Sequence, residues 1–215
     1  MKKLLIILGV IACLSGISAA QFTFYLIDNF EDGNISAGPK WWQFGGIKAE
    51  VVKNAAVEKR DLIAESCGDY SLKLVGSTQD WYIGGIGSDL GVDAQTFARF
   101  QIDIDGTNDS SGTLKIELFD DDNLNYSIEQ DPQHDYDPVY DDRFVAEIKV
   151  QGEGFTRISI PFTAFKDTNP GVGDDIWNPN QEDGSGGLLK MQLVAIGQTK
   201  VSSVDFNIDN LLLTY

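Results

Sequence analysis

The sequence predicts an all-β fold, in which two antiparallel sheets pack face to face as a β-sandwich. Three observations lead to this prediction. Apolar and polar residues alternate with a period of two in several short runs, as in strands that bury one face. Segments rich in Gly, Asp, Asn and Pro separate the runs, and these residues favour turns. Beyond the N-terminal segment, no stretch has the periodicity of an amphipathic helix.

The alternating runs can be taken in chain order. The first two, 99–104 and 114–118, flank a turn-rich segment at 106–112, and this arrangement predicts a hairpin. Further runs of the same kind lie at 144–150, 158–162, 191–195 and 204–208. Short strands of this number and spacing favour a two-sheet jelly roll.

Two segments between the predicted strands are unusually long. They run from Asp120 to Asp142 and from Lys166 to Gly187. Long loops in a compact β domain are usually functional or stabilised by a metal, because little apolar core offsets the entropy lost on ordering them. We therefore expect one or both loops to contribute to a site.

The N-terminus has the layout of a secretion signal. Lys2 and Lys3 precede an apolar run from Leu4 to Leu14, and the small residues Ser18, Ala19 and Ala20 follow. We expect a signal peptide at 1–20, one β-sandwich domain at 21–215, and a secreted, periplasmic or cell-surface protein. The alternative is a lipoprotein, because residues 10–13 also fit a lipobox that would attach lipid to Cys13. The apolar run is shorter than the roughly 20 residues that span a bilayer, and no later stretch predicts a transmembrane helix.

The net charge and the cysteine content exclude some classes of partner and an intrachain disulfide. The chain has 33 acidic and 16 basic residues, a formal net charge of −17. Such a surface repels nucleic acid and anionic lipid, so neither is an expected partner. Cys67 would be alone once the signal is removed, and the mature domain should have no intrachain disulfide.

Both ends of the mature chain carry a family resemblance. The segments Ile27–Gly33 and Val204–Leu211 resemble the first and last strands of jelly-roll carbohydrate-binding modules. Ser71–Leu74, Gly85–Gly91 and Phe100–Asp105 extend the similarity over most of the mature chain. The sequence most resembles family 11 of these modules and the related complex I intermediate-associated proteins. The resemblance implies a galactose-binding-domain-like fold and a carbohydrate ligand.

The resemblance also implies a structural calcium ion where the two end strands meet. Glu31 and Asp209 are the matching positions, and Asp28 could add a third carboxylate. A hard cation takes six to eight oxygen ligands, which nearby backbone carbonyls would complete. The alternative is that these residues form only a polar turn and an outward strand position. The acidic segment 120–123 is a second candidate, but its spacing does not require a metal, and a turn is the preferred interpretation.

Sugar recognition needs flat aromatic faces for the C–H patches of a pyranose and polar groups for its hydroxyls. Several aromatic residues lie in predicted loops or at strand ends, among polar residues. Asp142 and Arg143, at the start of the run at 144–150, are the polar candidates, because relatives place charged groups on the concave sheet. The predicted ligand-binding set is Trp42, Trp81, Tyr82, Tyr126, Tyr140, Asp142, Arg143 and Trp177.

The sequence offers little catalytic machinery. His134 is the one histidine, so neither a histidine-rich metal site nor a histidine-based triad beyond that residue can be built. We expect a secreted, non-catalytic domain that binds a polysaccharide or oligosaccharide, β-glucan in particular. Two alternatives remain open. A small jelly-roll glycoside hydrolase needs only two carboxylates. A cell-envelope or adhesion subunit would use the fold for assembly.

Overall fold

A computed structural model describes residues 24–55, 68–106, 112–197 and 202–215. The described chain consists of strands and connections, with one short 3₁₀ turn at Phe162–Ala164. None of its helices is long and apolar enough to cross a membrane. The predicted signal peptide, Cys13 and Cys67 lie outside the described residues.

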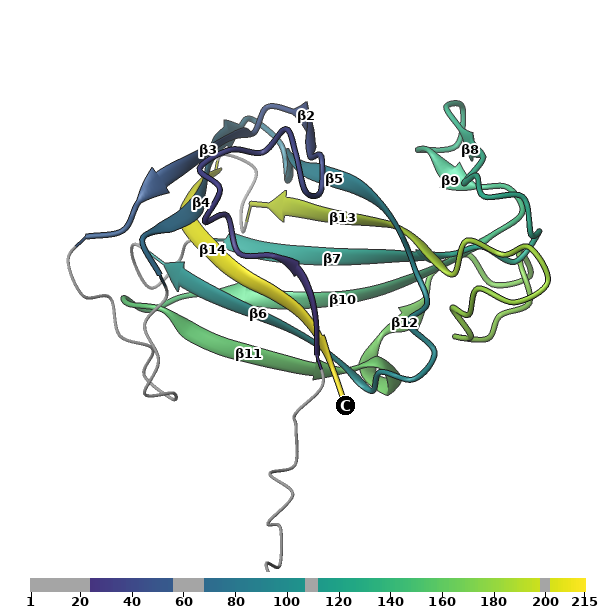
Figure 1. Ribbon diagram of the computed structural model, residues 1–215. Coiled ribbons are helices and arrows are strands. Elements are labelled where there is room, and N and C mark those ends of the chain that lie inside the picture. Colours follow the sequence, from purple (N-terminus) through teal and green to yellow (C-terminus); the bar gives the residue numbers. More distant parts are fainter. Residues whose placement is uncertain (1–23, 56–67, 107–111, 198–201) are drawn as a thin grey trace, which may run out of the picture.

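Two antiparallel six-stranded sheets form a sandwich (Figure 1), which confirms the predicted fold class. Sheet A has the order β11-β6-β14-β4-β3, with β1 paired to β14. Its strands are β1 (Phe24–Asp28), β3 (Lys48–Lys53), β4 (Tyr70–Thr78), β6 (Arg99–Gly106), β11 (Thr156–Pro161) and β14 (Ser202–Thr214). Sheet B has the order β12-β10-β7-β13-β5-β2. Its strands are β2 (Trp42–Gly45), β5 (Tyr82–Val92), β7 (Gly112–Asp120), β10 (Asp142–Val150), β12 (Lys166–Asp167) and β13 (Leu188–Ile196).

The core lies between the sheets and is built from the apolar phase of each alternating run. Leu114, Ile116 and Leu118 of β7 are wholly buried, as are Met191 and Leu193 of β13. Fully burying one such side chain contributes about 1.5–3 kcal/mol to folding. The alternation therefore sets which face of each strand is turned inward.

The predicted hairpin between 99–104 and 114–118 is wrong. The first run is β6, which pairs with β11 and β14 in sheet A, and the second is β7, which pairs with β10 and β13 in sheet B. A strand with one apolar face can bury that face equally well in either sheet of a sandwich. Alternation alone therefore does not determine which strands pair within a sheet.

The end strands meet in the middle of sheet A. β1 pairs with the C-terminal half of β14, where Asp28 lies opposite Leu211. The register of β14 against β6 shifts between Asp209 and Leu212, and Asn210 between them has a left-handed φ of 46°. Such a bulge turns neighbouring side chains to new directions. The residues predicted to bind calcium lie beside this irregularity.

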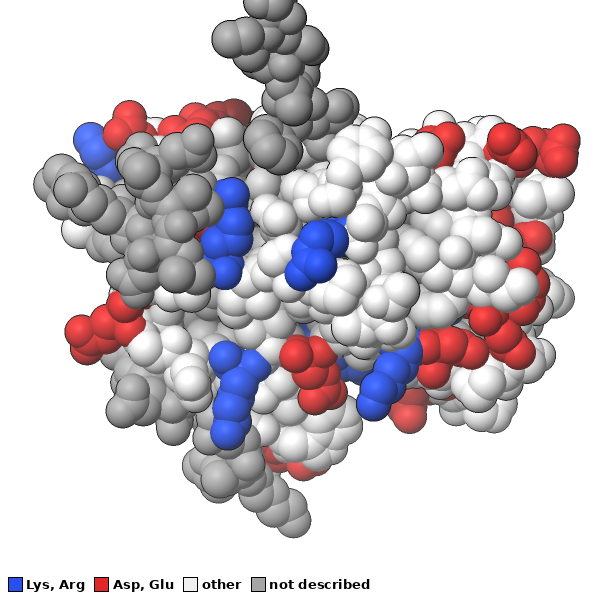
Figure 2. Space-filling view, turned by 90° about the horizontal axis from the view of Figure 1, so that it is seen from below, with Lys and Arg blue, Asp and Glu red and all other residues white. Residues whose placement is uncertain are grey.

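The two long loops lie together at one end of the sandwich, at the right of Figure 1. The loop between β7 and β10 carries the two-stranded ribbon of β8 (Gln130–Asp131) and β9 (Asp137–Pro138). Hydrogen bonds join the two loops, such as that from the Ser185 hydroxyl to the Asp121 carbonyl (2.9 Å). Figure 2 shows that acidic residues gather at this end.

Candidate functional site

The outer face of sheet B carries the residues of the alternating strands that point away from the core, polar and apolar together. The strand register places Trp42 of β2 beside Gly87 of β5, and Gln192 of β13 between Gly87 and Glu117 of β7. Val145 of β10 continues the row beyond Glu117. We call this surface the Trp42 face and define it by Trp42, Phe44, Tyr82, Lys115, Glu117 and Gln192.

Two glycines let aromatic rings lie against the Trp42 face. A Cβ atom on Gly87 would stand 2.5 Å from Cζ2 of the Trp42 ring, and one on Gly85 would stand 2.8 Å from Cζ of Phe44. Real Cβ atoms do not approach other atoms so closely, so each ring occupies the space that a larger residue would take. Both residues are half buried.

Charged and hydroxyl groups accompany these rings. Glu117 is 5% exposed, and its Oε1 forms an ion pair with Lys115 Nζ at 2.6 Å. Burial raises the pKa of Tyr82, and the negative charge of Glu117 adds to this effect. Tyr82 and Trp81 pack edge to face with ring centres 5.9 Å apart, and both are exposed. Flat apolar surfaces and hydrogen-bonding groups thus share one face.

Arg143 lies at the far side of sheet B, where the long loops join β10. Its guanidinium forms an ion pair with Asp137 of β9 at 2.7 Å and donates to the Thr168 hydroxyl at 2.9 Å. These two partners belong to different loops. Arg143 therefore holds both loops against the sheet by interactions within the protein.

The other predicted ligand residues are spread over the loop end. Tyr126 and Tyr140 are 58% and 57% exposed on the loop before β10. Trp177 packs on the core instead, with ring centres 5.3 Å from Phe144 and 4.8 Å from Phe162. Asp142 is wholly buried. We therefore leave Trp177 and Asp142 out of the solvent-facing sugar surface.

Asp142 belongs to a buried group of carboxylates that we call the loop acid cluster. Its other buried members are Asp120, Asp121 and Asp141, and Asp122 is half buried among them. Backbone N–H groups satisfy part of the cluster. Asn178 donates to Asp120 (2.9 Å), Gly186 and Tyr126 donate to Asp121 (2.6 and 3.0 Å), and Asp142 donates to Asp122 (2.8 Å).

The electrostatics of the loop acid cluster are unfavourable for ionised carboxyls. Burial raises the pKa of Asp120 to about 8, those of Asp122 and Asp142 to about 7, and that of Asp141 to about 6. Repulsion between the acids adds to the effect of burial. Backbone hydrogen bonds act in the opposite direction but only in part.

Three acids of this region could hold a metal ion. Asp122, Asp142 and Asp174 each place one carboxylate oxygen within 4.8 Å of the others. Gly173, with a φ of +72°, leaves room for them, because a Cβ atom there would collide with both Asp142 Oδ1 and Asp122 Oδ2. The sequence showed the oxygen density of 120–123 but not that Asp142 and Asp174 join it. Only the fold brings these segments together.

The predicted calcium ligands lie at the meeting of β1 and β14. Asp28 accepts hydrogen bonds from the Phe30 N–H (2.8 Å) and the Trp41 indole N–H (2.7 Å). Glu31 accepts from the N–H groups of Asp69 and Tyr70 at 3.2 and 3.0 Å. Asp209 is wholly buried, and its Oδ1 accepts from the Asn210 N–H at 2.7 Å.

These three acids differ from the loop group in geometry. Within the described ranges, they do not bring three ligand atoms within 4.8 Å of one another. Each bonded carboxylate oxygen retains a further lone pair, which a cation can use. Calcium binding by Glu31 and Asp209 stays a prediction.

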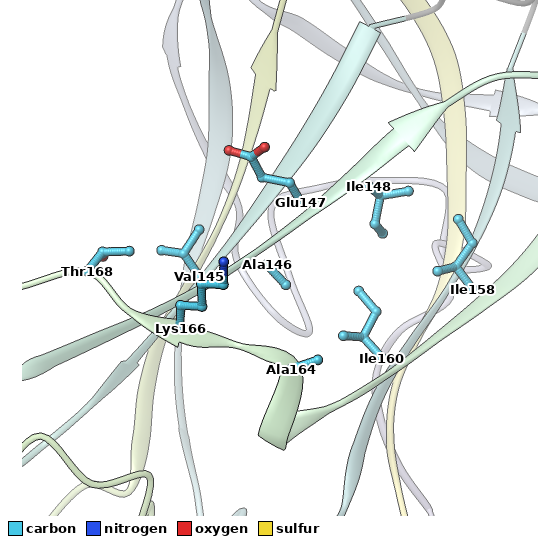
Figure 3. Close-up of a pocket in the computed structure, with 9 residues that line it drawn as sticks. All are labelled: Val145, Ala146, Glu147, Ile148, Ile158, Ile160, Ala164, Lys166 and Thr168. Atoms are coloured by element: carbon cyan, nitrogen blue, oxygen red, sulfur yellow. The ribbon is translucent and has the colours of Figure 1, made fainter.

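A hollow of about 520 Å³ opens at the edge of the sandwich between β10 and β11 (Figure 3). The lining is mostly apolar and includes Ile148, Ile158 and Ile160. Glu147, Lys166 and Thr168 are its polar lining residues. Because the hollow has no aromatic residue in its lining, it suits a sugar ring less well than the Trp42 face.

Of the residues that define the Trp42 face, the sequence analysis named Trp42 and Tyr82 as ligand candidates but did not single out Phe44, Lys115, Glu117 and Gln192. A signal for part of this set was present. Lys115 and Glu117 occupy the polar phase of a strand whose apolar phase was recognised as core. Their partnership with β2 was not readable, because it depends on the order of strands within the sheet.

No family model and no curated protein matches the chain. Solved structures match it over most of its length. The family 11 carbohydrate-binding module of the cellulosomal cellulase Lic26A-Cel5E of Clostridium thermocellum is 14% identical with a TM-score of 0.52, covering 90% of this chain and 95% of that one. A family 11 module from Clostridium thermocellum in complex with a β-1,3-1,4-mixed-linked tetrasaccharide is 15% identical with a TM-score of 0.52, covering 89% and 95%.

An exo-β-agarase also matches, at 12% identity and a TM-score of 0.53, over 88% of this chain and 25% of its own length. At these identities the likeness concerns the fold. The resemblance found in the sequence is confirmed at that level, and the chain has the β-sandwich fold of the carbohydrate-binding modules.

Proposed function

We propose that this protein binds a polysaccharide or oligosaccharide on the Trp42 face without catalysing its cleavage. One observation carries the proposal. The Trp42 ring lies over Gly87 in the same row of sheet B as Gln192 and Glu117, so an aromatic surface adjoins polar side chains.

The chemistry of this face suits a sugar. Half-buried Trp42 and Phe44 and exposed Tyr82 offer flat surfaces to the C–H faces of pyranose rings, and exposed Trp81 packs against Tyr82. Lys115 can donate hydrogen bonds to hydroxyls and Gln192 can both donate and accept, while the buried Glu117 holds Lys115 in place through their ion pair. These groups lie on regular strands, so little conformational entropy is lost when a ligand binds.

A β-glucan is the glycan class that we propose to test first. The structurally similar family 11 module was solved with a β-1,3-1,4-mixed-linked tetrasaccharide. An extended row of side chains across several strands suits a linear chain of sugars. Agarose is the second probe, because the structurally similar agarase acts on that polymer class.

Export and calcium belong to the same proposal. The N-terminal layout supports secretion with cleavage after Ala20, and lipid attachment at Cys13 is the alternative. Mass spectrometry of the mature N-terminus distinguishes the two. Structural calcium at Glu31 and Asp209 is supported by two carboxylates beside the meeting of the end strands.

The deciding experiment measures binding to mixed-linked β-glucan together with release of reducing sugar. Tyr82→Ala should weaken binding roughly ten-fold, because a lost stacking contact costs about 1–1.5 kcal/mol. Tyr25→Ala is the matched control, since Tyr25 has similar exposure (39% against 41%) but lies on β1 of the other sheet.

Each other outcome has a defined meaning. Equal loss from Tyr82→Ala and Tyr25→Ala would remove the Trp42 face from the proposal. Release of sugar that Glu117→Gln abolishes would show a glycoside hydrolase. No binding to any of a panel of soluble and insoluble polysaccharides would favour an envelope or adhesion subunit.

A further inference from the structure

A buried carboxylate oxygen without a partner marks the loop acid cluster. Asp142 is 0% exposed, and its Oδ2 accepts the Ile176 N–H at 3.1 Å. Its Oδ1 is buried and has no hydrogen-bond partner in the part of the chain that the structure describes. An unsatisfied buried acceptor costs about 1–3 kcal/mol, and more when it is charged. The Asp142 Oδ1 atom is therefore available to bind a cation or a proton.

The direction of this oxygen points to the ligand's position. Asp142 Oδ1 and Asp122 Oδ2 both touch the space beside Gly173 that a Cβ atom would fill. Carboxylate oxygens of Asp122, Asp142 and Asp174 lie within 4.8 Å of one another. Oxygens bound to one calcium ion at about 2.4 Å must meet that same limit.

Within the described part of the chain, the three carboxylates have no basic partner. Among the described ion pairs, none joins a Lys or Arg side chain to Asp122, Asp142 or Asp174. Arg143, the next residue along the chain, pairs with Asp137 instead. Asp142 is wholly buried and Asp122 is half buried, so their negative charges can remain close together only when protons or a cation neutralise them.

We propose that Asp122, Asp142 and Asp174 bind one divalent cation, calcium, which joins the two long loops at the end of sheet B. The donor set is entirely carboxylate oxygen, which suits a hard cation and not zinc or copper. Calcium accepts irregular geometry with six to eight ligands, so backbone carbonyls and water would complete its shell.

Backbone groups already orient the three ligands. The Asp142 N–H donates to Asp122, and the Ile176 N–H donates to both Asp142 and Asp174 (3.1 and 2.9 Å). The Asn178 side chain holds the other oxygen of Asp174 at 2.9 Å. A cation here would bridge the end of β7, the start of β10 and the loop before β13. It would also stabilise the segment that contains Arg143.

The test uses chelator-treated protein to which calcium is added, followed by calorimetric titration and thermal melting. Calcium at a hundredfold excess over Kd should raise Tm by roughly 5–10 °C for a domain of this size. In a Glu31→Gln background, which lacks the predicted end-strand site, Asp142→Asn and Asp174→Asn should abolish this gain. Asp183→Asn, an exposed acid on the same loop, makes the same change in charge and should keep the full gain.

A second readout separates a ligand from a merely structural residue. Without calcium, Asp142→Asn should melt at or above the temperature of the parent protein, because it removes one of several mutually repelling charges. A structural residue would lower Tm both with and without calcium. Asp174 is exposed, so Asp174→Asn keeps the test valid if Asp142→Asn does not fold.

Glu31→Gln distinguishes this site from calcium at the end strands, since it removes only the latter. The proposal is overturned if Asp142→Asn and Asp174→Asn retain the parent's calcium gain. It is also overturned if the parent protein binds no calcium while it remains folded. Loss of sugar binding in Tyr82→Ala bears only on the Trp42 face, so the two proposals fail independently.

Discussion

The Trp42 face and the loop acid cluster lie on the same sheet but are stabilised in opposite ways. The Trp42 face consists of regular strands, and its one strongly buried acid, Glu117, has Lys115 as a counter-ion at 2.6 Å. The loop acid cluster lies where β7 and β10 meet the long loops, and its buried acids are satisfied only in part, by backbone N–H groups. Regular strands can therefore position the residues of the Trp42 face without a bound ion. The carboxylates of the loop acid cluster need a proton or a cation to neutralise their charge.

The comparison first predicts that aromatic rings in the two regions have different roles. Trp177 lies at the loop end but packs on Phe144 and Phe162. Trp177→Ala should lower the free energy of unfolding by about 3 kcal/mol, because it leaves a cavity against the core. Glycan affinity should change little. Urea unfolding and binding isotherms of the same preparation check this, and a ten-fold weaker affinity at unchanged stability would contradict it.

Calcium at the end strands gives the next largest expected effect. With calcium at a hundredfold excess over Kd, ligation by Glu31 and Asp209 should add about 2.7 kcal/mol to the free energy of unfolding. Glu31→Gln should remove this gain, while the gain that depends on Asp174 persists. Melting curves of the single and double variants, with chelator and with calcium, measure both. An identical calcium response in Glu31→Gln and the parent would leave the loop acid cluster as the sole candidate site.

Glycine beneath an aromatic ring is the feature that most distinguishes the Trp42 face. Gly87→Ala should cost about 1–3 kcal/mol of stability and weaken glycan binding, because the new Cβ strikes the Trp42 ring. In a Trp42→Ala background the same change should cost much less. A double-mutant cycle measures this coupling, and additive effects of the two changes would show that ring and glycine act separately.

The smallest expected effect concerns Tyr82 and Glu117. Burial and the Glu117 charge both raise the Tyr82 pKa. Glu117→Gln should therefore lower that pKa part of the way toward the usual tyrosine value, with burial accounting for the rest. The measurement is a spectrophotometric titration with Tyr82→Phe as the reference for the other tyrosines. An unchanged titration would show that the Glu117 charge does not influence the Tyr82 pKa.

The sequence by itself determined the strands and their inward faces. The alternating runs at 99–104, 114–118, 144–150 and 191–195 all became strands with the expected core residues, because a period of two follows from the local geometry of the chain. The resemblance of the end segments also led to the correct fold. These features depend on neighbours within a few residues.

Tertiary structure alone decided which strands became neighbours and which acids met. The runs at 99–104 and 114–118 lie in different sheets. Their apolar faces are buried against each other's sheet as effectively as they would be if the two strands paired. Asp122, Asp142 and Asp174 are distant in sequence, and only the folding of two long loops against each other brings their oxygens within 4.8 Å. The Trp42 face likewise depends on β2 reaching β5. Such contacts depend on strand order and loop path, which local residue patterns do not specify.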